Sequence, residues 1–306
     1  MKIVFFGNPQ FAASSLKHLN NLNDISIDLV VTNPDKKSGR GLSKKMSEVK
    51  KTALDLSYKI YECDSLKEND LYNSLKSINA DLFIVVAYKY IPQKIYNLPK
   101  IGTINLHASL LPKYRGASPI QYALINGDKE TGLTTFYINK TIDQGNIISQ
   151  LSIPINDRIT FNELYKNLEE LSKDILEDTL KKITSNNDKS SIINNKENEY
   201  IAPKIKRDFF KINWNDKSIN IHNKIRALSY KGAYGFLENR RIKFFDTYYS
   251  NKSIGIDIGE FIIKDNILLI ETGKGHLLSK YIQLEGSKRI TALDFINSNI
   301  ITNKFE

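Results

Sequence analysis

The sequence lacks several features that define whole classes of protein. It has a single cysteine, Cys63, which excludes an intramolecular disulfide and a zinc site built from a cysteine cluster. No apolar run approaches the roughly 20 residues of a membrane-spanning helix. Met1 and Lys2 lead directly into the apolar run 3–6, with no small-residue cleavage site of a secretory signal. These absences predict a cytoplasmic protein.

Phosphate-binding glycine motifs are also missing. The loop at residues 7–11 reads Gly-Asn-Pro-Gln-Phe, with one glycine where a dinucleotide-binding fold carries G-x-G-x-x-G. A pyrophosphate needs close backbone approach at the second glycine of that motif. The chain has no G-x-x-x-x-G-K-[ST] sequence either. The sequence therefore argues against NAD or ATP as the cofactor.

What the chain does have is an ordinary apolar content and an excess of positive charge. Its 306 residues are 41% hydrophobic and 25% charged, which suits a globular protein of two domains. The formal net charge is +10, and residues 201–306 hold 18 Lys and Arg against 11 Asp and Glu. The basic excess thus lies mainly in the last third, and it is compatible with a polyanionic partner.

Apolar runs that alternate with amphipathic segments predict a doubly wound, mostly parallel α/β sheet. The run 80–88 is apolar almost throughout, as a parallel strand buried on both faces should be. The other elements expected are strands at 3–6, 27–32, 101–107 and 133–138, and helices at 11–19, 49–56 and 160–183. Together they predict a Rossmann-like domain over residues 1–183.

A polar stretch at residues 184–203 predicts a linker to a second domain at 204–306. One helix is expected there at 219–228. Five short strands are expected at 233–237, 242–249, 259–263, 267–272 and 281–284. Gly and Asn at the turns favour a small β-barrel of the oligonucleotide-binding (OB) kind.

Three polar residues suggest chemistry at one strand end. Asn105 and His107 are two residues apart near the end of the predicted strand 101–107, so their side chains share a face. Ligand sites of open α/β sheets form at that edge. Asp143 follows another predicted strand and precedes Gln144 and Gly145, a turn that could aim its carboxylate there. An amide, an imidazole and a carboxylate can support an oxyanion, shuttle a proton and orient the ring, which favours acyl or one-carbon transfer.

Each of these residues also has a plainer interpretation. An isolated histidine at a strand end is more often structural, and an aspartate before Gln-Gly is commonly a turn former. The apolar segment Ser109-Leu110-Leu111-Pro112 could form the wall of a flat aromatic ligand site, or it could belong to the core.

The wider segment resembles the formyltetrahydrofolate-dependent formyltransferases. Residues 105–116 read N-x-H-x-S-L-L-P-x-x-R-G, followed by Pro-Ile-Gln at 119–121 and by N-G-D-x-E-T-G at 126–132. The resemblance implies a formyl transfer from 10-formyltetrahydrofolate without a metal ion. It implies Asn105, His107 and Asp143 as the catalytic residues. The folate-contacting residues that it implies are Ser109, Leu110, Leu111, Pro112 and Tyr88.

A basic segment indicates which of these formyltransferases the chain resembles. Residues 33–51 carry seven Lys and Arg and two acids, which could be a solvated loop or a finger that contacts a phosphate backbone. The pattern P-D-x-x-x-G-R-G at 34–41 is similar to the acceptor-arm loop of methionyl-tRNA formyltransferases. It implies Arg40, Lys44 and Lys45 as tRNA contacts, and initiator methionyl-tRNA as the substrate whose α-amine is formylated for translation initiation.

The second predicted domain continues the resemblance, with I-x-W at 212–214 and I-x-N-x-I-R-A-L at 221–228. It implies a tRNA-binding module in a monomeric enzyme. The chain departs from the family at Lys89, where many relatives have glycine, and at 229–232, which lacks the usual prolines. Two alternatives stay open: a sugar-nucleotide N-formyltransferase, and a nucleic-acid-binding protein on a retired enzyme scaffold.

Overall fold

The computed structural model describes residues 1–38, 43–185, 200–297 and 302–306. Contacts within the chain divide it into two compact units, neither of which is one continuous stretch. The first unit comprises Met1–Gly116, Gly132–Ser152 and Asn167–Ile201, and the second comprises Ala117–Thr131, Ile153–Lys166 and Ala202–Glu306.

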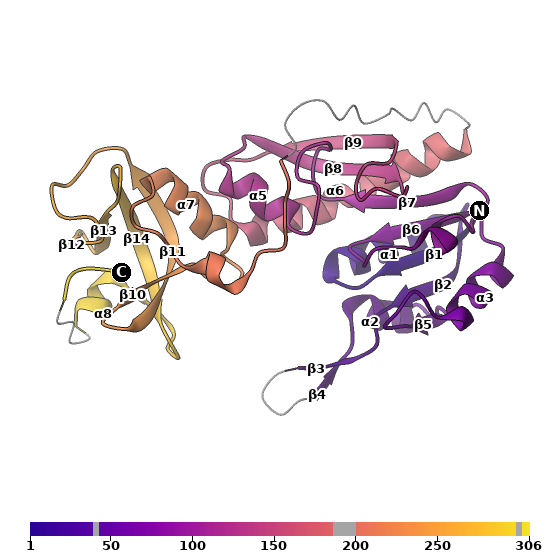
Figure 1. Ribbon diagram of the computed structural model, residues 1–306, viewed down its shortest axis with the longest axis horizontal. Helices are drawn as coiled ribbons and strands as arrows, with labels where there is room; N and C mark the ends of the chain where they lie inside the picture. The colour runs from indigo at the N-terminus through magenta and orange to yellow at the C-terminus, as the bar shows by residue number, and fades with distance from the viewer. Residues whose placement is uncertain (39–42, 186–199, 298–301) are drawn as a thin grey trace. The chain divides into compact units, whose positions relative to one another are not determined.

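The first unit is built on a seven-stranded sheet in the order β5-β2-β1-β6-β7-β8-β9 (Figure 1). The strands are β1 (Lys2–Gly7), β2 (Ser26–Thr32), β5 (Ile60–Glu62), β6 (Leu82–Val86), β7 (Gly102–His107), β8 (Glu130–Tyr137) and β9 (Ile147–Pro154). The first five run parallel, and β8 is antiparallel to β7. The predicted mostly parallel sheet is confirmed. Strand β6 is shorter than predicted, because the chain turns at Ala87, whose φ is +47°.

Helices cover both faces of this sheet, as a doubly wound fold requires. The helices are α1 (Gln10–Asn20), α2 (Glu48–Asp55), α3 (Asn69–Ile78), α4 (Gln93–Tyr96) and α6 (Phe161–Thr184). Phe83 and Val85 pack with Leu71 and Leu75 of α3 in one apolar cluster. On the other face, the hydroxyl of Thr135 lies 2.6 Å from that of Thr179 in α6. The predicted helices 11–19, 49–56 and 160–183 are confirmed to within one residue.

The basic segment at 33–51 contains regular structure that the prediction of a loop did not include. Strands β3 (Lys36–Ser38) and β4 (Ser43–Lys45) pair antiparallel as a hairpin. Its connecting residues 39–42 lie outside the described residues. Lys36 stands opposite Lys45 in the register, so two positive residues are neighbours on this hairpin.

The second unit holds α5 (Pro119–Ile125), a short 3-10 helix (Arg207–Phe210), α7 (Ser218–Ala227), α8 (Ala292–Ile296) and a six-stranded antiparallel sheet. The strands are β10 (Tyr234–Leu237), β11 (Arg240–Ser250), β12 (Phe261–Lys264), β13 (Ile267–Glu271), β14 (His276–Leu284) and β15 (Arg289–Thr291). Their order is β10-β11-β14-β13-β12, and β15 pairs with β14. Strand β15 was not predicted, and β14 begins five residues before the predicted strand.

Residues 303–306 close this sheet into a barrel. The N–H of Phe261 in β12 donates to the carbonyl of Asn303, and Phe236 of β10 exchanges two backbone hydrogen bonds with Glu306. The side chain of Phe305 is buried against the rings of Trp214, Phe244 and Phe261. The small barrel predicted from the sequence is confirmed, and an extended segment joins its two edge strands.

No helix in the described parts of the chain combines the length and the apolar character needed to cross a membrane.

Candidate active site

Strand β7 carries Asn105 and His107 to the carboxyl edge of the first unit's sheet. Ile104 and Leu106, which alternate with them along the strand, are fully or nearly fully buried. His107 lies opposite Thr134 in the register with β8, and Asn105 lies opposite Phe136. The amide and the imidazole therefore share one face of the sheet, beside the second half of β8.

The ring of His107 is oriented by a backbone carbonyl. Its Nε2 lies 2.9 Å from the carbonyl oxygen of Tyr114, which can only accept, so Nε2 carries the proton. Its Nδ1 lies 3.9 Å from Oδ2 of Asp143. That separation is too long for a hydrogen bond but suits an ion pair once Nδ1 is protonated. The two side chains are only 8% and 11% exposed, so water screens this pair weakly.

Asp143 is held by the turn that contains it. Its Oδ2 accepts a hydrogen bond of 2.9 Å from the N–H of Gly116. Its own φ is +52°, a left-handed conformation that aspartate tolerates better than most residues. A Cβ atom on Gly145 would lie 1.5 Å from the carbonyl oxygen of Tyr137, so only glycine fits there. The turn is thus fixed against the end of β8, and the carboxylate is aimed at His107.

The segment Ser109–Pro112 is anchored by two side chains of β8 and β9. The Thr134 hydroxyl donates to the carbonyl of Ser109 at 2.6 Å and accepts from the N–H of Leu111 at 3.1 Å. Gln150 donates to the carbonyl of Leu111 and to the Thr134 hydroxyl, both at 2.9 Å. The Ser109 hydroxyl in turn donates to the carbonyl of Lys113 at 2.6 Å. This segment is therefore a fixed wall beside His107.

Tyr88 and Lys89 lie after β6. The Tyr88 hydroxyl faces the thiol of Cys63 at 3.8 Å, and burial raises the pKa of the phenol well above its ordinary range. Lys89 donates to the backbone carbonyls of Cys63 and Asp64 at 3.0 and 2.8 Å. The lysine that replaces the expected glycine is thus tied to the backbone, with its ammonium 5.2 Å from the Tyr88 ring centre.

Two family models match the chain. The formyl transferase model matches residues 1–180, and the model of the formyl transferase C-terminal domain matches residues 204–299. The chain belongs to the formyl transferase family. The resemblance inferred from residues 105–132 is confirmed by this result.

Named relatives of this formyltransferase match it over nearly their full length. A methionyl-tRNA formyltransferase of Thermodesulfovibrio yellowstonii is 41% identical, covering 98% of this chain and 96% of the relative. That of Azobacteroides pseudotrichonymphae is 37% identical, covering 97% and 96%. Among solved structures, the sugar 3N-formyl transferase WlaRD shares 25% identity, with a TM-score of 0.67 over 94% of this chain and 99% of that one. An N-formyltransferase of Helicobacter canadensis has the same TM-score at 23% identity, over 91% and 98%, and shows the shared fold.

Several groups of this candidate site could not be predicted from the motifs. The carbonyl of Tyr114 and the N–H of Gly116 are backbone groups, which any residue provides. Thr134 and Gln150 look like ordinary strand residues, although their position opposite the N-x-H-x-S-L-L-P segment could have drawn attention to them. Within the described residues, no group of three or more His, Cys, Asp or Glu side chains could hold a metal ion.

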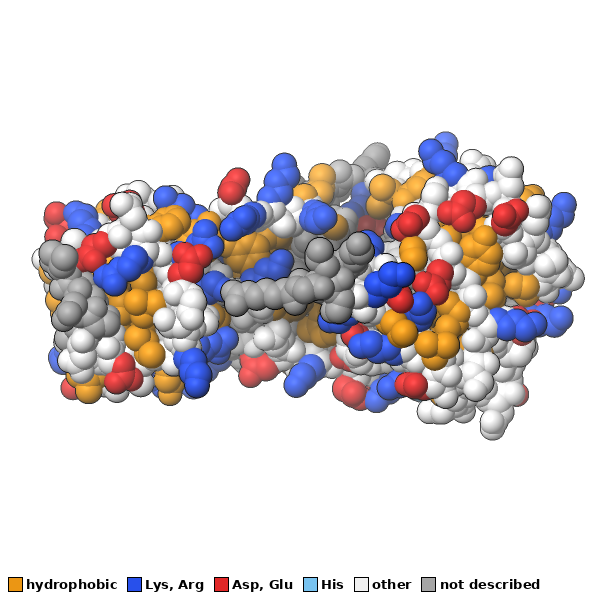
Figure 2. Space-filling model, turned by 90° about the horizontal axis from the view of Figure 1, so that it is seen from below, with side chains coloured by type: hydrophobic (Ala, Val, Ile, Leu, Met, Phe, Trp, Pro, Cys, Tyr) orange, Lys and Arg blue, Asp and Glu red, His pale blue; other side chains and the backbone are white. Residues whose placement is uncertain are grey.

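The lysines of the basic segment 33–51 differ in their partners. Lys50, in α2, lies 2.8 Å from both Asp35 and Glu62, and hydrogen bonds to these carboxylates raise its pKa. Lys44 and Lys45 are exposed and form no ion pair within the described parts of the chain. Arg40, which was predicted to contact tRNA, lies outside the described residues. Lys and Arg are otherwise dispersed over the face in Figure 2, with Asp and Glu among them.

Proposed function

We propose that this formyltransferase transfers the formyl group of 10-formyltetrahydrofolate to the α-amine of initiator methionyl-tRNA. The observation that carries the proposal is the buried His107–Asp143 pair beside Asn105 on β7, in a chain 41% identical to a methionyl-tRNA formyltransferase. We further propose that it acts as a monomer in the cytoplasm during translation initiation.

His107 acts as the proton shuttle. An α-amine titrates near pH 8, roughly, and must be neutral to attack the formyl carbon. Because Nε2 is committed to the Tyr114 carbonyl, Nδ1 is the atom that accepts the proton from the attacking nitrogen. The same proton is returned to the folate nitrogen as its bond to the formyl carbon breaks and tetrahydrofolate leaves. Asp143 faces Nδ1 at 3.9 Å and stabilises the resulting imidazolium. Asn105 donates to the oxyanion of the tetrahedral intermediate, a contact worth about 3 kcal/mol of barrier.

The folate lies against Ser109, Leu110, Leu111 and Pro112, with Tyr88 near the pocket. This role is supported by the rigid hold of Thr134 and Gln150 on the backbone of that segment. A preformed apolar wall lowers the entropy lost when a flat ring system binds.

The acceptor end of the tRNA contacts the basic hairpin through Arg40, Lys44 and Lys45. Like-charged lysines that stand opposite each other repel, and a phosphate between them relieves the repulsion. A sugar nucleotide is the second candidate acceptor, which the likeness to WlaRD supports. It would make little use of the hairpin.

Formyl transfer to methionyl-tRNA, measured with 10-formyltetrahydrofolate as donor, tests the proposal. Asp143→Asn should lower kcat by roughly a thousandfold or more, because it removes the charge that stabilises the imidazolium. Asp174→Asn, at an exposed position of α6, is the matched control. If Asp143→Asn transferred the formyl group as fast as the wild type, the roles assigned to Asp143 and His107 would be overturned.

The hairpin is tested by Lys44→Ala/Lys45→Ala and by Arg40→Ala, with the exposed Lys264→Ala as control. We expect a higher KM for tRNA and a weaker dependence of kcat/KM on salt, because fewer phosphates are neutralised. Transfer to a sugar-nucleotide amine but not to tRNA would replace the proposed acceptor with the second candidate.

A further inference from the structure

The second unit contains a cavity of about 590 Å³ that the proposed active site does not use. It lies among the segment 158–163, the end of α7 and the middle of β11. The side chains that matter for its chemistry are Arg158, Arg226, Arg289, Ser229, Tyr248 and Tyr281. Its volume is within the range of roughly 300–1,000 Å³ that small-molecule sites occupy.

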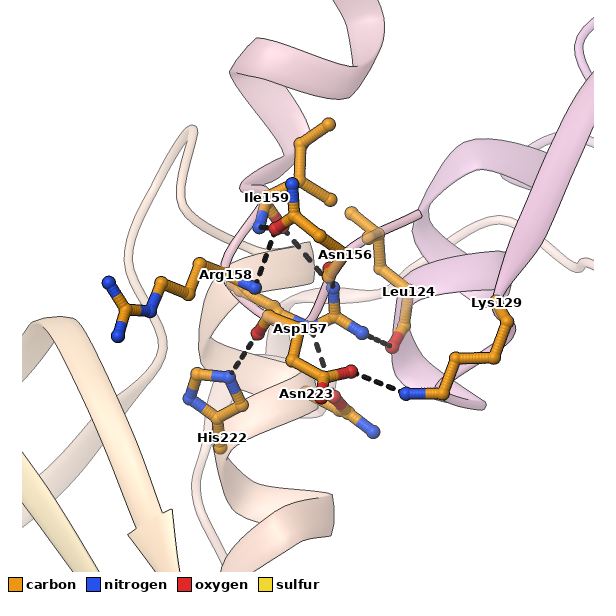
Figure 3. Close-up of polar contacts among 9 residues, drawn as sticks. Leu124, Lys129, Asn156, Asp157, Arg158, Ile159, His222 and Asn223 are labelled. Carbon is orange, nitrogen blue, oxygen red and sulfur yellow. Dashed lines mark hydrogen bonds and ion pairs between the residues drawn. The ribbon is translucent and has the colours of Figure 1, made fainter. Parts of the chain in front are cut away.

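Arg226 places a buried positive charge in the wall of this cavity. The residue is 4% exposed, and its guanidinium donates to the side-chain oxygen of Asn223 at 2.9 Å. Its remaining acceptors are the backbone carbonyls of Asn156, Ile159 and Leu124, at 3.0 to 3.4 Å (Figure 3). All four acceptors are neutral. The charge is therefore held in place without being neutralised by a hydrogen-bonded carboxylate, so it attracts anions into the cavity.

Asp157, the carboxylate whose charge acts on Arg226, is committed elsewhere. Asp157 forms an ion pair of 2.5 Å with Lys129, and its backbone carbonyl accepts from His222 at 2.8 Å. Of the two acids that line the cavity, Glu163 accepts hydrogen bonds from the backbone and hydroxyl of Thr160. The other, Asp246, lies 4.0 Å from Lys280.

Two more arginines are fixed at the cavity by stacking rather than by ion pairs. The guanidinium of Arg158 lies 5.0 Å from the ring centre of Tyr248, and that of Arg289 lies 3.6 Å from the ring centre of Phe245. The Arg158 side chain points away from the cluster around Arg226 in Figure 3. Neither guanidinium has a hydrogen bond or ion pair within the residues that the structure describes. Stacking on a ring holds the plane of a guanidinium and leaves its N–H edges available for phosphate.

The remaining wall suits a planar, polar ring. Tyr281 is 44% exposed, so it offers ring surface for stacking, whereas the Tyr248 ring already contacts Arg158 and Lys280. The hydroxyl oxygen of Ser229 is buried and has no hydrogen-bond partner among the described residues. A buried hydroxyl without a partner costs free energy, and a ligand atom would recover it.

We propose that this cavity binds a nucleotide, with its phosphate on Arg158 and Arg289 in the field of Arg226 and its base stacked on Tyr281. The nucleotide is either a free nucleoside phosphate or an unpaired nucleotide of the RNA acceptor. Only the second source rests on the proposed function.

Binding to the full-length chain tests this assignment. The Kd values of 5′-AMP and of inorganic phosphate are measured by calorimetry, and that of uncharged initiator tRNA by filter binding over a range of salt concentrations. The variants are Arg158→Ala/Arg289→Ala and Tyr281→Ala. The control is Arg240→Ala, an exposed arginine at the start of β11, away from the cavity. All four side chains are exposed, so the fold should survive, and circular dichroism checks this.

For whichever ligand occupies the site, 5′-AMP or tRNA, the Kd of the double arginine variant should be roughly tenfold or more above that of the wild type. Each charge-assisted bond to phosphate is among the stronger hydrogen bonds. If tRNA is the ligand, the slope of log K against log salt should fall by about 0.9 for each phosphate that the variant no longer neutralises. Tyr281→Ala should weaken 5′-AMP or tRNA and leave phosphate alone unchanged.

Each outcome decides one point. Saturable binding of 5′-AMP that the double variant abolishes assigns a free nucleotide, and an effect on tRNA alone assigns an RNA nucleotide. If the double arginine variant and Tyr281→Ala bind all three ligands with the same Kd values as the control Arg240→Ala, the proposal is overturned. Formyl transfer to tRNA is measured in parallel on the wild type. A wild type that transfers the formyl group but binds no nucleotide overturns this proposal alone, and one that binds the nucleotide but transfers no formyl group overturns only the proposed function.

Discussion

Removal of the Thr134 hydroxyl should disturb the segment Ser109–Pro112, which we propose contacts the folate. Thr134→Val keeps the shape of the side chain but deletes an oxygen that joins the Ser109 carbonyl, the Leu111 N–H and the Gln150 amide. Thr134 itself is 0% exposed. Gln150 is exposed and keeps its bond to the Leu111 carbonyl, so it loses little. The two buried backbone groups that lose a partner are the Ser109 carbonyl and the Leu111 N–H.

An unsatisfied buried polar group costs about 1–3 kcal/mol, so the two orphaned groups cost roughly 2–6 kcal/mol. The segment can recover part of this by shifting toward water, which removes the wall from beside His107. Since 1.4 kcal/mol corresponds to about a factor of ten, we expect the KM for 10-formyltetrahydrofolate to rise at least about tenfold. The kcat should change less, because the Thr134 hydroxyl bonds to Ser109, Leu111 and Gln150, whereas the ring of His107 is positioned by Tyr114 and Asp143.

The matched control is the next residue. Thr135 is also 0% exposed, but its side chain lies on the opposite face of the sheet, and among the described residues its hydroxyl bonds to Thr179 alone. Thr135→Val should lower the free energy of unfolding without raising the KM for the folate donor. Steady-state kinetics and urea unfolding on both variants make the comparison. Equal KM values for the two variants would refute the assignment of Thr134 as the anchor of the wall.

Three further outcomes are expected. Phe305→Ala should lower the free energy of urea unfolding by about 3–5 kcal/mol, because it leaves a cavity among three aromatic rings; a loss below 1 kcal/mol, roughly, would contradict this packing role. Burial lowers the pKa of His222 from 6.5, so its neutral form is favoured in the folded state. Stability should be full above pH 6.5 and fall below it, and His222→Gln should flatten that dependence in urea titrations at several pH values. Cys63 is 2% exposed and burial raises the pKa of its thiol, so a disulfide reagent should label it only on unfolding, and rapid labelling of the native protein would count against the core position.

Much of the first unit could be predicted because its strands are buried on both faces and its helices are strongly periodic. The short edge strand β5 could not, since three residues form no pattern. Strand β14 was cut short for a different reason. On β14, Leu277 and Ser279 are buried, the next two residues Lys280 and Tyr281 are both exposed, and burial resumes at Ile282. A regular alternation of apolar residues therefore does not run through this strand.

The sequence could predict which side chains form the candidate site, but not the backbone groups that position them. Asn105 and His107 were placed together because two residues on one strand share a face, and the structure has them so. Asp143 comes from a distant turn, which the sequence indicated could aim a carboxylate at this edge, and the family resemblance supplied its catalytic role. The roles of these residues stay predictions. The orientation of the imidazole depends on the Tyr114 carbonyl, which no residue type encodes.

The four acceptors of Arg226 have a consequence for anyone who divides or recombines this chain. Three of them belong to residues 124, 156 and 159, which lie before the polar stretch 184–203 in the sequence, whereas Arg226 lies after it. A chimera joined within that stretch would unite an arginine from one parent with carbonyls from another. If the carbonyls of the second parent do not coincide, a guanidinium is buried without partners, at a cost of several kcal/mol. Exchanges between relatives should therefore transfer residues 117–131 and 153–166 together with the barrel.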